Sequence, residues 1–151
     1  MSKWLYKGKP LKEIPEGAYG FTYKVTLNFR QLSPSYYIGM KCFCSRRNTK
    51  ISKKRAEELY SGKGRRKTKE LKVCESDWKS YCTSSVSLKK LILDQGEQNF
   101  KWEVLTIYYS KTELELGEAR EIIDSMCDPL CENQWLKLTI YKKNLDCNKN
   151  S

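Results

Sequence analysis

Three stretches of the chain combine aromatic and β-branched residues in partly alternating patterns, which are typical of strands. They are residues 19–27 (YGFTYKVTL), 36–43 (YYIGMKCF) and 99–110 (NFKWEVLTIYYS). A moderate loop that contains Pro34 separates the first two, so they predict an antiparallel hairpin. We therefore expect a small, mainly antiparallel sheet of three strands, with a short closing element at residues 131–143.

Three further stretches carry the start and stop signals of helices, and they cover residues 51–62, 85–96 and 110–126. Ser52 and Ser110 stand where side-chain caps are expected, and Gly62 and Gly96 stand at the expected helix ends. Gly117 lowers the helix propensity of the third stretch locally. Helices that flank a small sheet predict an α+β fold, arranged as an α/β sandwich.

The chain has 151 residues, which is a suitable length for one domain with a buried core. We expect residues 19–145 to form that domain and to carry a basic insertion at residues 46–72. An irregular arm, residues 1–18, is expected to pack on the domain through Trp4 and Tyr6. The tail, residues 146–151, is expected to be loose.

Charge is concentrated in one part of the chain. Residues 41–72 hold 13 Lys and Arg against three Asp and Glu, a net of +10, whereas the whole chain has a formal net charge of +11. Solvated surface charge is the simple explanation, but a charge-balanced surface would serve solubility equally well. A polyanionic partner, which means DNA, RNA or an anionic membrane surface, explains the excess better. The residues expected to contact the phosphate backbone of DNA are Lys53, Lys54, Arg55, Arg65, Arg66 and Lys67.

The residues that are absent exclude several classes of protein. The chain has no histidine, so a Ser-His-Asp or Cys-His catalytic site is excluded. Its seven cysteines include no CxxC pair, and without histidine they favour reduced thiols over a zinc site. No apolar run is long enough to cross a bilayer, and the N-terminus has no apolar signal core. We expect an intracellular protein that is neither secreted nor membrane-bound.

A series of short motifs follows the predicted elements in a recognisable order. They are GFTY at residues 20–23, YIG at 37–39, Lys41, ESDWKSY at 75–81 followed by Ser84-Ser85, the glutamate segment 113–118, and Glu132-Asn133. This series resembles the GIY-YIG nuclease domain, and most closely the phage endonucleases of the SegE-like group, over about residues 4–140. The first signature reads GFTY in place of GIY but retains Tyr23, and the spacing to the second signature is longer than usual.

The resemblance implies a DNA endonuclease that hydrolyses phosphodiester bonds with one divalent cation, Mg²⁺ or Mn²⁺. It implies that Tyr23 is the general base, that Tyr37 orients water or phosphate, and that Glu118 holds the cation. A free phenol has a pKa near 10, but close cations favour phenolate, and Lys41 is expected nearby with an arginine and the metal. In a host cell, such a phage-type enzyme would act in the cytoplasm.

The remaining site residues are less sharply defined. The family's arginine lies on a helix soon after YIG; Arg46 and Arg47 have about the right offset, whereas Arg55 lies on the predicted helix. An arginine suits this place because its planar fork grips phosphate oxygens. The side chains from the resembling segments that we expect to contact DNA are Trp78, Tyr81, Ser84 and Asn133.

Each of these residues, taken alone, has a simpler explanation. A tyrosine on a sheet is usually packing, Glu118 alone would be a solvated helix charge, and Trp78 and Tyr81 would pin a loop. Two other functions therefore stay open: a non-catalytic basic nucleic-acid-binding protein, and a small basic protein that binds a protein partner or a membrane surface. Recognition sequence, single- or double-strand cutting, monomer or homodimer, and biological role are not determined by the sequence.

Overall fold

The computed structural model describes residues 2–27 and 32–133, and the chain forms two compact units. One unit is built from residues 1–43 and 77–151, and the other from residues 44–76. The predicted tail at 146–151 and most of the closing element predicted at 131–143 lie outside the described residues. Among the helices that are described, none has the length and apolar character that crossing a bilayer requires.

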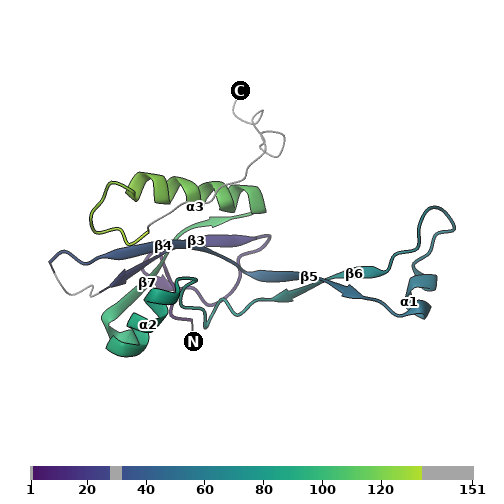
Figure 1. Cartoon of the computed structure of the whole chain (residues 1–151), viewed down its shortest axis with the longest axis horizontal. Helices are drawn as coiled ribbons and strands as arrows, with labels where there is room; N and C mark the ends of the chain where they lie inside the picture. Colours follow the sequence, from purple (N-terminus) through teal and green to yellow (C-terminus); the bar gives the residue numbers. More distant parts are fainter. Residues whose placement is uncertain (1, 28–31, 134–151) are drawn as a thin grey trace, which may run out of the picture. The chain divides into compact units, whose positions relative to one another are not determined.

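The larger unit contains a five-stranded mixed sheet (Figure 1). In spatial order its strands are β2 (Lys9–Pro10), β1 (Leu5–Tyr6), β7 (Phe100–Tyr108), β3 (Gly20–Leu27) and β4 (Tyr36–Cys42). β3 pairs antiparallel with both β4 and β7, which confirms the predicted hairpin, whereas β1 runs parallel to β7. The prediction of three strands is wrong because the N-terminal arm adds β1 and β2, which are too short to show an alternating pattern.

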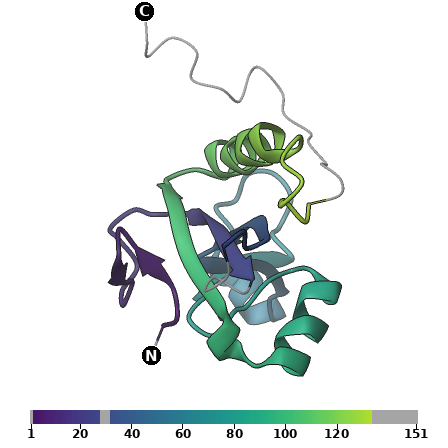
Figure 2. The same ribbon diagram turned by 90° about the vertical axis from the view of Figure 1, so that its left-hand side faces the viewer.

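Two helices flank this sheet as the pattern predicted. α2 (Val86–Gln95) and α3 (Lys111–Ser125) begin at caps whose serine side chains accept backbone hydrogen bonds, those of Ser85 and Ser110. α3 lies along one face of the sheet and α2 lies on the other side, after which a short 3₁₀ turn, η1 (Glu97–Asn99), leads into β7 (Figures 1 and 2). A Cβ atom on Gly117 would lie 2.2 Å from the Tyr108 hydroxyl, so this glycine allows α3 to pack closely on β7.

The central strand β3 is buried on both faces. Gly20 faces α3, where an added Cβ would lie 2.7 Å from Leu114 Cδ2. Phe21, Tyr23 and Val25 point to the opposite face and have no exposed surface. On that face, the ring centroids of Trp4, Phe43 and Trp78 lie 5.1–6.4 Å from that of Phe21, and this aromatic core anchors the segments around it.

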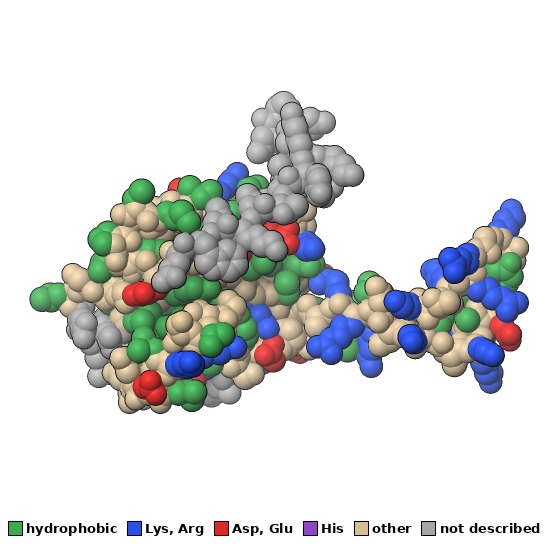
Figure 3. Space-filling model, in the orientation of Figure 1, with side chains coloured by type: hydrophobic (Ala, Val, Ile, Leu, Met, Phe, Trp, Pro, Cys, Tyr) green, Lys and Arg blue, Asp and Glu red, His purple; other side chains and the backbone are tan. Residues whose placement is uncertain are grey.

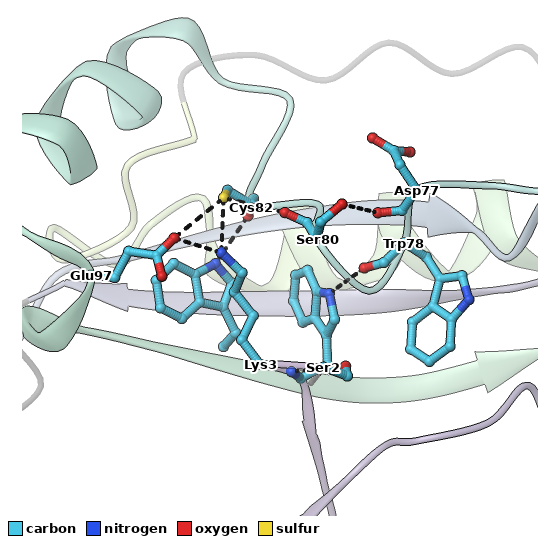
Figure 4. A network of polar contacts seen from close by, with 9 residues as sticks. Ser2, Lys3, Asp77, Trp78, Ser80, Cys82 and Glu97 are labelled. Atoms are coloured by element: carbon cyan, nitrogen blue, oxygen red, sulfur yellow. Dashed lines mark hydrogen bonds and ion pairs between the residues drawn. The ribbon is translucent and has the colours of Figure 1, made fainter.

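The aromatic core also fixes the segment of residues 77–85, here called the 77–85 loop. The indole N–H of Trp4 donates to the backbone carbonyl of Trp78 at 2.7 Å, and both side chains are fully buried (Figure 4). The indole N–H of Trp102, on β7, donates to the carbonyl of Cys82 at 3.1 Å. The N-terminal arm and β7 therefore hold the two halves of this loop.

Lys3 adds a polar tie between the arm and the same loop. Its ammonium donates to Glu97 Oε1 at 2.7 Å and to Cys82 Sγ at 3.0 Å, and lies 4.6 Å from the Trp102 ring centroid (Figure 4). A cation over an indole face is attracted by the ring quadrupole. The arm is thus joined to the loop by charge as well as by packing.

The smaller unit is a two-stranded antiparallel ribbon, β5 (Cys44–Lys50) paired with β6 (Lys69–Glu75), with the helix α1 (Lys53–Glu58) between them in sequence. The predicted cap is confirmed, because the Ser52 hydroxyl accepts the backbone N–H of Arg55 at 3.3 Å. The helix ends at Glu58, before Gly62. β5 and β6 were not predicted, since their charged side chains hide the alternation that marks a strand.

We predict that Trp4→Phe lowers the free energy of unfolding by about 1–3 kcal/mol, because the buried carbonyl of Trp78 loses its donor. The midpoint of urea unfolding measures this. Tyr6→Phe, on the half-buried strand β1, is the matched control and should change stability by less than about 0.5 kcal/mol. Equal effects of the two substitutions would contradict the role given to the Trp4 hydrogen bond.

Candidate active site

Four hydroxyl-bearing side chains meet on the face of the sheet opposite α3, and they are called here the hydroxyl cluster: Tyr23, Tyr37, Tyr81 and Ser84. The backbone N–H of Ser84 donates to the Tyr23 hydroxyl at 3.4 Å, and the Ser84 and Tyr37 hydroxyls lie 3.3 Å apart. The Tyr23 ring centroid lies 6.5 Å from that of Tyr37 and 6.0 Å from that of Tyr81. The Tyr23 and Tyr81 hydroxyls also share a hydrogen bond.

The register of β3 and β4 explains why these tyrosines converge. Tyr23 stands directly opposite Gly39, so the two residues share a face, and Tyr37 lies two positions earlier on the same face. A Cβ atom on Gly39 would lie 2.5 Å from the Tyr23 hydroxyl oxygen. The glycine of the YIG motif is therefore needed so that the Tyr23 ring can lie across β4 and reach the 77–85 loop.

Burial dominates the electrostatics of Tyr23. The side chain has no exposed surface, and this desolvation, with the neighbouring Tyr81, raises the pKa of the Tyr23 phenol well above its usual range. Hydrogen bonds from Thr83 and Ser84 act in the opposite direction but are weaker. In the protein alone burial therefore dominates the pKa of Tyr23, and the expectation that Lys41, an arginine and a metal favour the phenolate stays a prediction.

Lys41 lies beside the hydroxyl cluster and is held there by two partners. Its ammonium is 2.5 Å from Asp77 Oδ1 and 4.1 Å from the ring centroid of Tyr81. The hydrogen bond from Lys41 is the main reason that the pKa of Asp77 is lowered. The ammonium therefore places a positive charge next to Tyr81, which in turn contacts Tyr23.

Glu118 reaches the site from the opposite face, at the outer edge of the sheet. β4 is the last strand of the sheet, and Glu118 on α3 accepts a hydrogen bond from the backbone of Met40 on that strand. Burial raises the pKa of Glu118 in spite of this hydrogen bond. The carboxylate and Tyr37 interact electrostatically, which adds to the rise in the pKa of Tyr37 that burial causes. Glu118 therefore lies at the β4 edge, where its charge acts on one member of the hydroxyl cluster, Tyr37.

Asn133 covers the same edge one step further along β4. Its side-chain oxygen accepts the backbone N–H of Ile38 at 2.9 Å, and its amide donates to the Ile38 carbonyl at 2.9 Å. Both the oxygen and the nitrogen of the amide are therefore hydrogen-bonded within the protein. Asn133 covers backbone groups of the edge strand β4, whereas we had expected it to contact DNA. The backbone groups of Tyr36 are covered in the same way, by Leu130 and Glu132.

One further expected site residue, Trp78, has different surroundings from those predicted. Trp78 is fully buried in the aromatic core, so the prediction that it contacts DNA is wrong; its ring anchors the 77–85 loop instead. Tyr81 and Ser84, from the same loop, do lie in the hydroxyl cluster, and Ser84 is exposed. The loop therefore has a buried end and a surface end.

The arginine candidates belong to the smaller unit. Arg46 and Arg47 lie on the strand β5, whereas the family's arginine lies on a helix, and as consecutive residues they point to opposite faces of the ribbon. Arg55 lies on α1, and its guanidinium contacts Glu58 and Glu70, each at 3.4 Å. None of the three is a member of the hydroxyl cluster. The expected phosphate-contacting residues Lys53, Lys54, Arg65, Arg66 and Lys67 are likewise in this unit and are exposed.

Asp77 and Thr83 are site residues that sequence reasoning missed. Asp77 lies in the SDWxxY segment and pairs with Lys41, while Thr83 is fully buried and hydrogen-bonds Tyr23. The sequence does contain one signal for Asp77, because an acid within a segment expected to lie near a catalytic lysine is a natural ion-pair partner. Thr83 carries no such signal, since its role depends on the path of the loop.

We predict that Glu118→Gln makes the protein more stable than wild type at pH 7.5 in EDTA. Because burial raises the pKa of Glu118, the folded state binds this proton more tightly than the unfolded chain does, and the stability it provides is lost as pH rises through the folded pKa. The advantage of the variant should disappear below pH 4.5, the usual value for this group. Thermal unfolding at both pH values measures it.

The control is Glu113→Gln, which changes an exposed carboxylate on the same helix and should not give a comparable rise at pH 7.5. If Glu118→Gln is less stable than wild type at both pH values, the hydrogen bond from Met40 outweighs burial and the electrostatic description of Glu118 is wrong.

A comparison with protein families identifies the family of the chain. The chain matches the family "Putative endonuclease segE, GIY-YIG domain" over residues 4–134, which include the strands, the 77–85 loop and α3. Neither the curated proteins nor the solved structures compared contain a match. The family match spans well over half of the chain and every member of the hydroxyl cluster. The protein therefore belongs to the GIY-YIG nuclease family, in the SegE-type group.

Proposed function

We propose that this GIY-YIG nuclease is a divalent-metal-dependent DNA endonuclease whose active site consists of the hydroxyl cluster and Glu118. The observation that carries the proposal is that the two signature tyrosines lie side by side and that the half-buried carboxylate of Glu118, at the β4 edge, interacts electrostatically with Tyr37. Three phenols and a serine hydroxyl gathered on one face of the sheet, with an acid at its edge, are difficult to explain by packing alone. Perturbed titratable groups gathered in this way are typical of functional sites.

The residues present suit Mg²⁺ or Mn²⁺ better than a metal held entirely by protein side chains. Among residues 2–27 and 32–133, no group of three or more Cys, Asp or Glu side chains could hold an ion. Mg²⁺ commonly takes only one or two carboxylates and keeps several waters. Glu118 supplies one carboxylate, and a nearby cation would offset the burial that raises its pKa. When bound, the cation would neutralise charge on the phosphate and stabilise the leaving oxygen.

In the proposed mechanism Tyr23 accepts the proton of the attacking water. Hydrogen bonds from Ser84 and Thr83 favour its phenolate form, which burial otherwise disfavours. Tyr37 and Tyr81 are half-buried, so a proton can pass along the cluster between the enclosed Tyr23 and the surface. Tyr37 positions water or phosphate, with its hydroxyl held by Ser84. Proton transfer by a positioned side chain contributes typically about 10²- to 10⁴-fold to a rate.

Positive charge around the phosphate would come from two sources. Lys41 lies beside Tyr81 within the larger unit. Arg46 or Arg47 is proposed to grip phosphate oxygens, because a guanidinium can donate two parallel hydrogen bonds to them. Both arginines belong to the smaller unit, residues 44–76, which is called the basic unit from here on. The exposed lysines and arginines of the same unit would neutralise neighbouring phosphates of the DNA backbone.

One observation favours a second candidate function, a nucleic-acid-binding protein without catalysis. Tyr23 has no exposed surface, and its raised pKa suits a core tyrosine as well as a base. The basic unit would bind phosphate backbone equally well in either case. The two functions differ in whether Tyr23 and Glu118 are needed for anything besides stability, and a cleavage assay separates them.

We predict that the protein nicks supercoiled plasmid in the presence of Mg²⁺ or Mn²⁺, and that EDTA abolishes this activity. Tyr23→Phe and Glu118→Ala should each lower the nicking rate by about 100-fold or more, since one removes the proton acceptor and the other the metal ligand. Gel electrophoresis of the plasmid forms measures the rate, and a filter-binding assay in EDTA should show affinity within a few-fold of wild type.

Tyr36→Phe is the matched control for these variants. Tyr36 is also on β4, but its hydroxyl bonds Asp128 at 2.7 Å and its side chain points away from the hydroxyl cluster. This variant should nick at close to the wild-type rate. Equal activity of Tyr23→Phe and wild type would remove the proposed base, and DNA binding without any metal-dependent cleavage would decide for the second function.

We also predict that the basic unit provides most of the salt-dependent affinity for DNA. Replacing Arg65, Arg66 and Lys67 by glutamine should reduce the slope of log K against log salt by about 2–3, because each neutralised phosphate contributes roughly 0.9 to that slope. Fluorescence anisotropy with a labelled duplex measures this. Three exposed lysines of the larger unit, Lys12, Lys89 and Lys90, are the control set. Equal reductions from both sets would mean that total charge, and not this unit, sets the affinity.

A further inference from the structure

The β5–β6 ribbon has two chemically different faces. Seven residue pairs, from Cys44–Glu75 to Lys50–Lys69, fix which side chains share a face. We call one side the apolar face; its members are Cys44, Arg46, Asn48, Lys50, Lys69, Leu71, Val73 and Glu75. The opposite face holds Ser45, Arg47, Thr49, Glu70, Lys72 and Cys74.

Leu71 and Val73 are the unexplained feature of the apolar face. Their side chains are 57% and 52% exposed, and every residue of β6 is exposed. Single exposed apolar residues are common, but these two are neighbours on one face. Directly across from them on β5 stand Asn48 and Arg46. The centre of the face thus combines two apolar side chains with an amide and a guanidinium, and its ends carry Cys44, Lys50, Lys69 and Glu75.

The charge of the unit indicates what could cover this face. Residues 44–76 hold 12 Lys and Arg against four Asp and Glu, a net of +8, which leaves only +3 for the rest of the chain. Figure 3 shows blue lysine and arginine side chains gathered over β5, β6 and α1, with few red ones among them. A second copy of this unit would be repelled, whereas a polyanion would be attracted. The occupant is therefore expected to be anionic.

The dimensions of the ribbon match a groove of duplex DNA. Seven residues per strand span about 20 Å, and paired strands lie about 4.8 Å apart. The major groove of B-DNA is about 12 Å wide and admits a two-stranded ribbon. Asparagine can bond adenine at two atoms, arginine can bond guanine, and apolar side chains contact the thymine methyl group. These are the side-chain types that the apolar face presents.

We propose that the apolar face of the ribbon enters the DNA major groove and reads base edges there, with Asn48, Leu71 and Val73 as specificity-determining residues. The proposal rests on DNA being the substrate of the nuclease. It separates two tasks within one small unit: the lysines and arginines supply affinity that does not depend on sequence, and three uncharged side chains supply the preference for particular bases.

A binding selection in EDTA tests this without relying on cleavage. The full-length protein is incubated with a pool of duplexes that carry a randomised centre, and the bound DNA is sequenced. The variant Asn48→Thr/Leu71→Thr/Val73→Thr keeps good strand formers and leaves every charge in place. The control Ser45→Ala/Thr49→Ala/Cys74→Ser changes three uncharged residues of the opposite face. Circular dichroism verifies that both variants are folded.

The wild type and the control should enrich a short motif of about six base pairs, the length that a 20 Å ribbon covers at 3.4 Å per base pair. The apolar-face variant should show at least a tenfold loss of that enrichment and bind the unselected pool within about threefold of wild type. A wild type without any motif, a variant that keeps the motif, or an equal loss in the control would each overturn the proposal. A third result would assign the face to a membrane. In that case no DNA motif is enriched, the wild type and the control bind anionic phosphatidylserine vesicles, and the apolar-face variant does not.

Plasmid nicking with Mg²⁺, measured on the same proteins, separates this proposal from the proposed function. If the motif depends on the apolar face but nothing is cut, the groove-reading proposal stands and the enzyme proposal fails. If the wild type nicks DNA and the apolar-face variant keeps the wild-type motif, the enzyme proposal stands and the groove-reading proposal fails.

Discussion

The close approach of the Tyr23 ring to the backbone of Gly39 is the contact on which the rest of the candidate site depends. No other residue could stand opposite Tyr23 without displacing its hydroxyl, since a single added carbon would lie 2.5 Å from it. The ring crosses β4 because that space is empty, and its hydroxyl then meets the 77–85 loop at Ser84. The Trp4–Trp78 hydrogen bond and the aromatic core hold the loop in the position where Ser84 reaches this hydroxyl. A glycine on one strand therefore determines where a phenol on the next strand can act.

The electrostatic condition of the site follows from this enclosure. Burial raises the pKa of Tyr23, Tyr37, Tyr81 and Glu118 alike, so all four groups are biased toward their neutral, protonated forms. A divalent cation that binds together with the DNA would favour loss of these protons at the moment when a base and a metal ligand are required. The desolvation that raises these pKa values thus also makes the ionisation of the four groups depend on whether a cation is bound.

The sequence predicted the elements that have a strong local signal. Three strands were found because aromatic and β-branched residues mark them, and three helices because serine caps precede them. β1 and β2 have two residues each and owe their existence to the pairing of the arm with β7 and to the burial of Trp4. β5 and β6 were missed because nearly every position carries a polar or charged side chain. Local pattern cannot identify a strand that buries nothing.

The candidate site was predictable only in part, for a related reason. Tyr23, Tyr37 and Glu118 came from the order of motifs, whereas the amphipathic pattern of α3 gives no indication that Glu118 turns toward the β4 edge. Trp78 and Asn133 were assigned to DNA because exposed aromatic and amide groups suit it, but the aromatic core and the edge of β4 take them instead. Whether a side chain faces the interior or the solvent depends on tertiary packing, which the motifs do not encode.

The outer edge of β4 has a consequence for how the protein behaves in concentrated solution. An uncovered edge strand can pair with a strand of another molecule and so begin aggregation. Here the outward backbone groups are covered by Leu130, Glu132, Asn133 and Glu118. The last of these is also the proposed metal ligand, so an inactivated protein that lacks its carboxylate would present the backbone of Met40 to passing strands. The proposed metal ligand and the barrier to self-association are, at this one position, the same side chain.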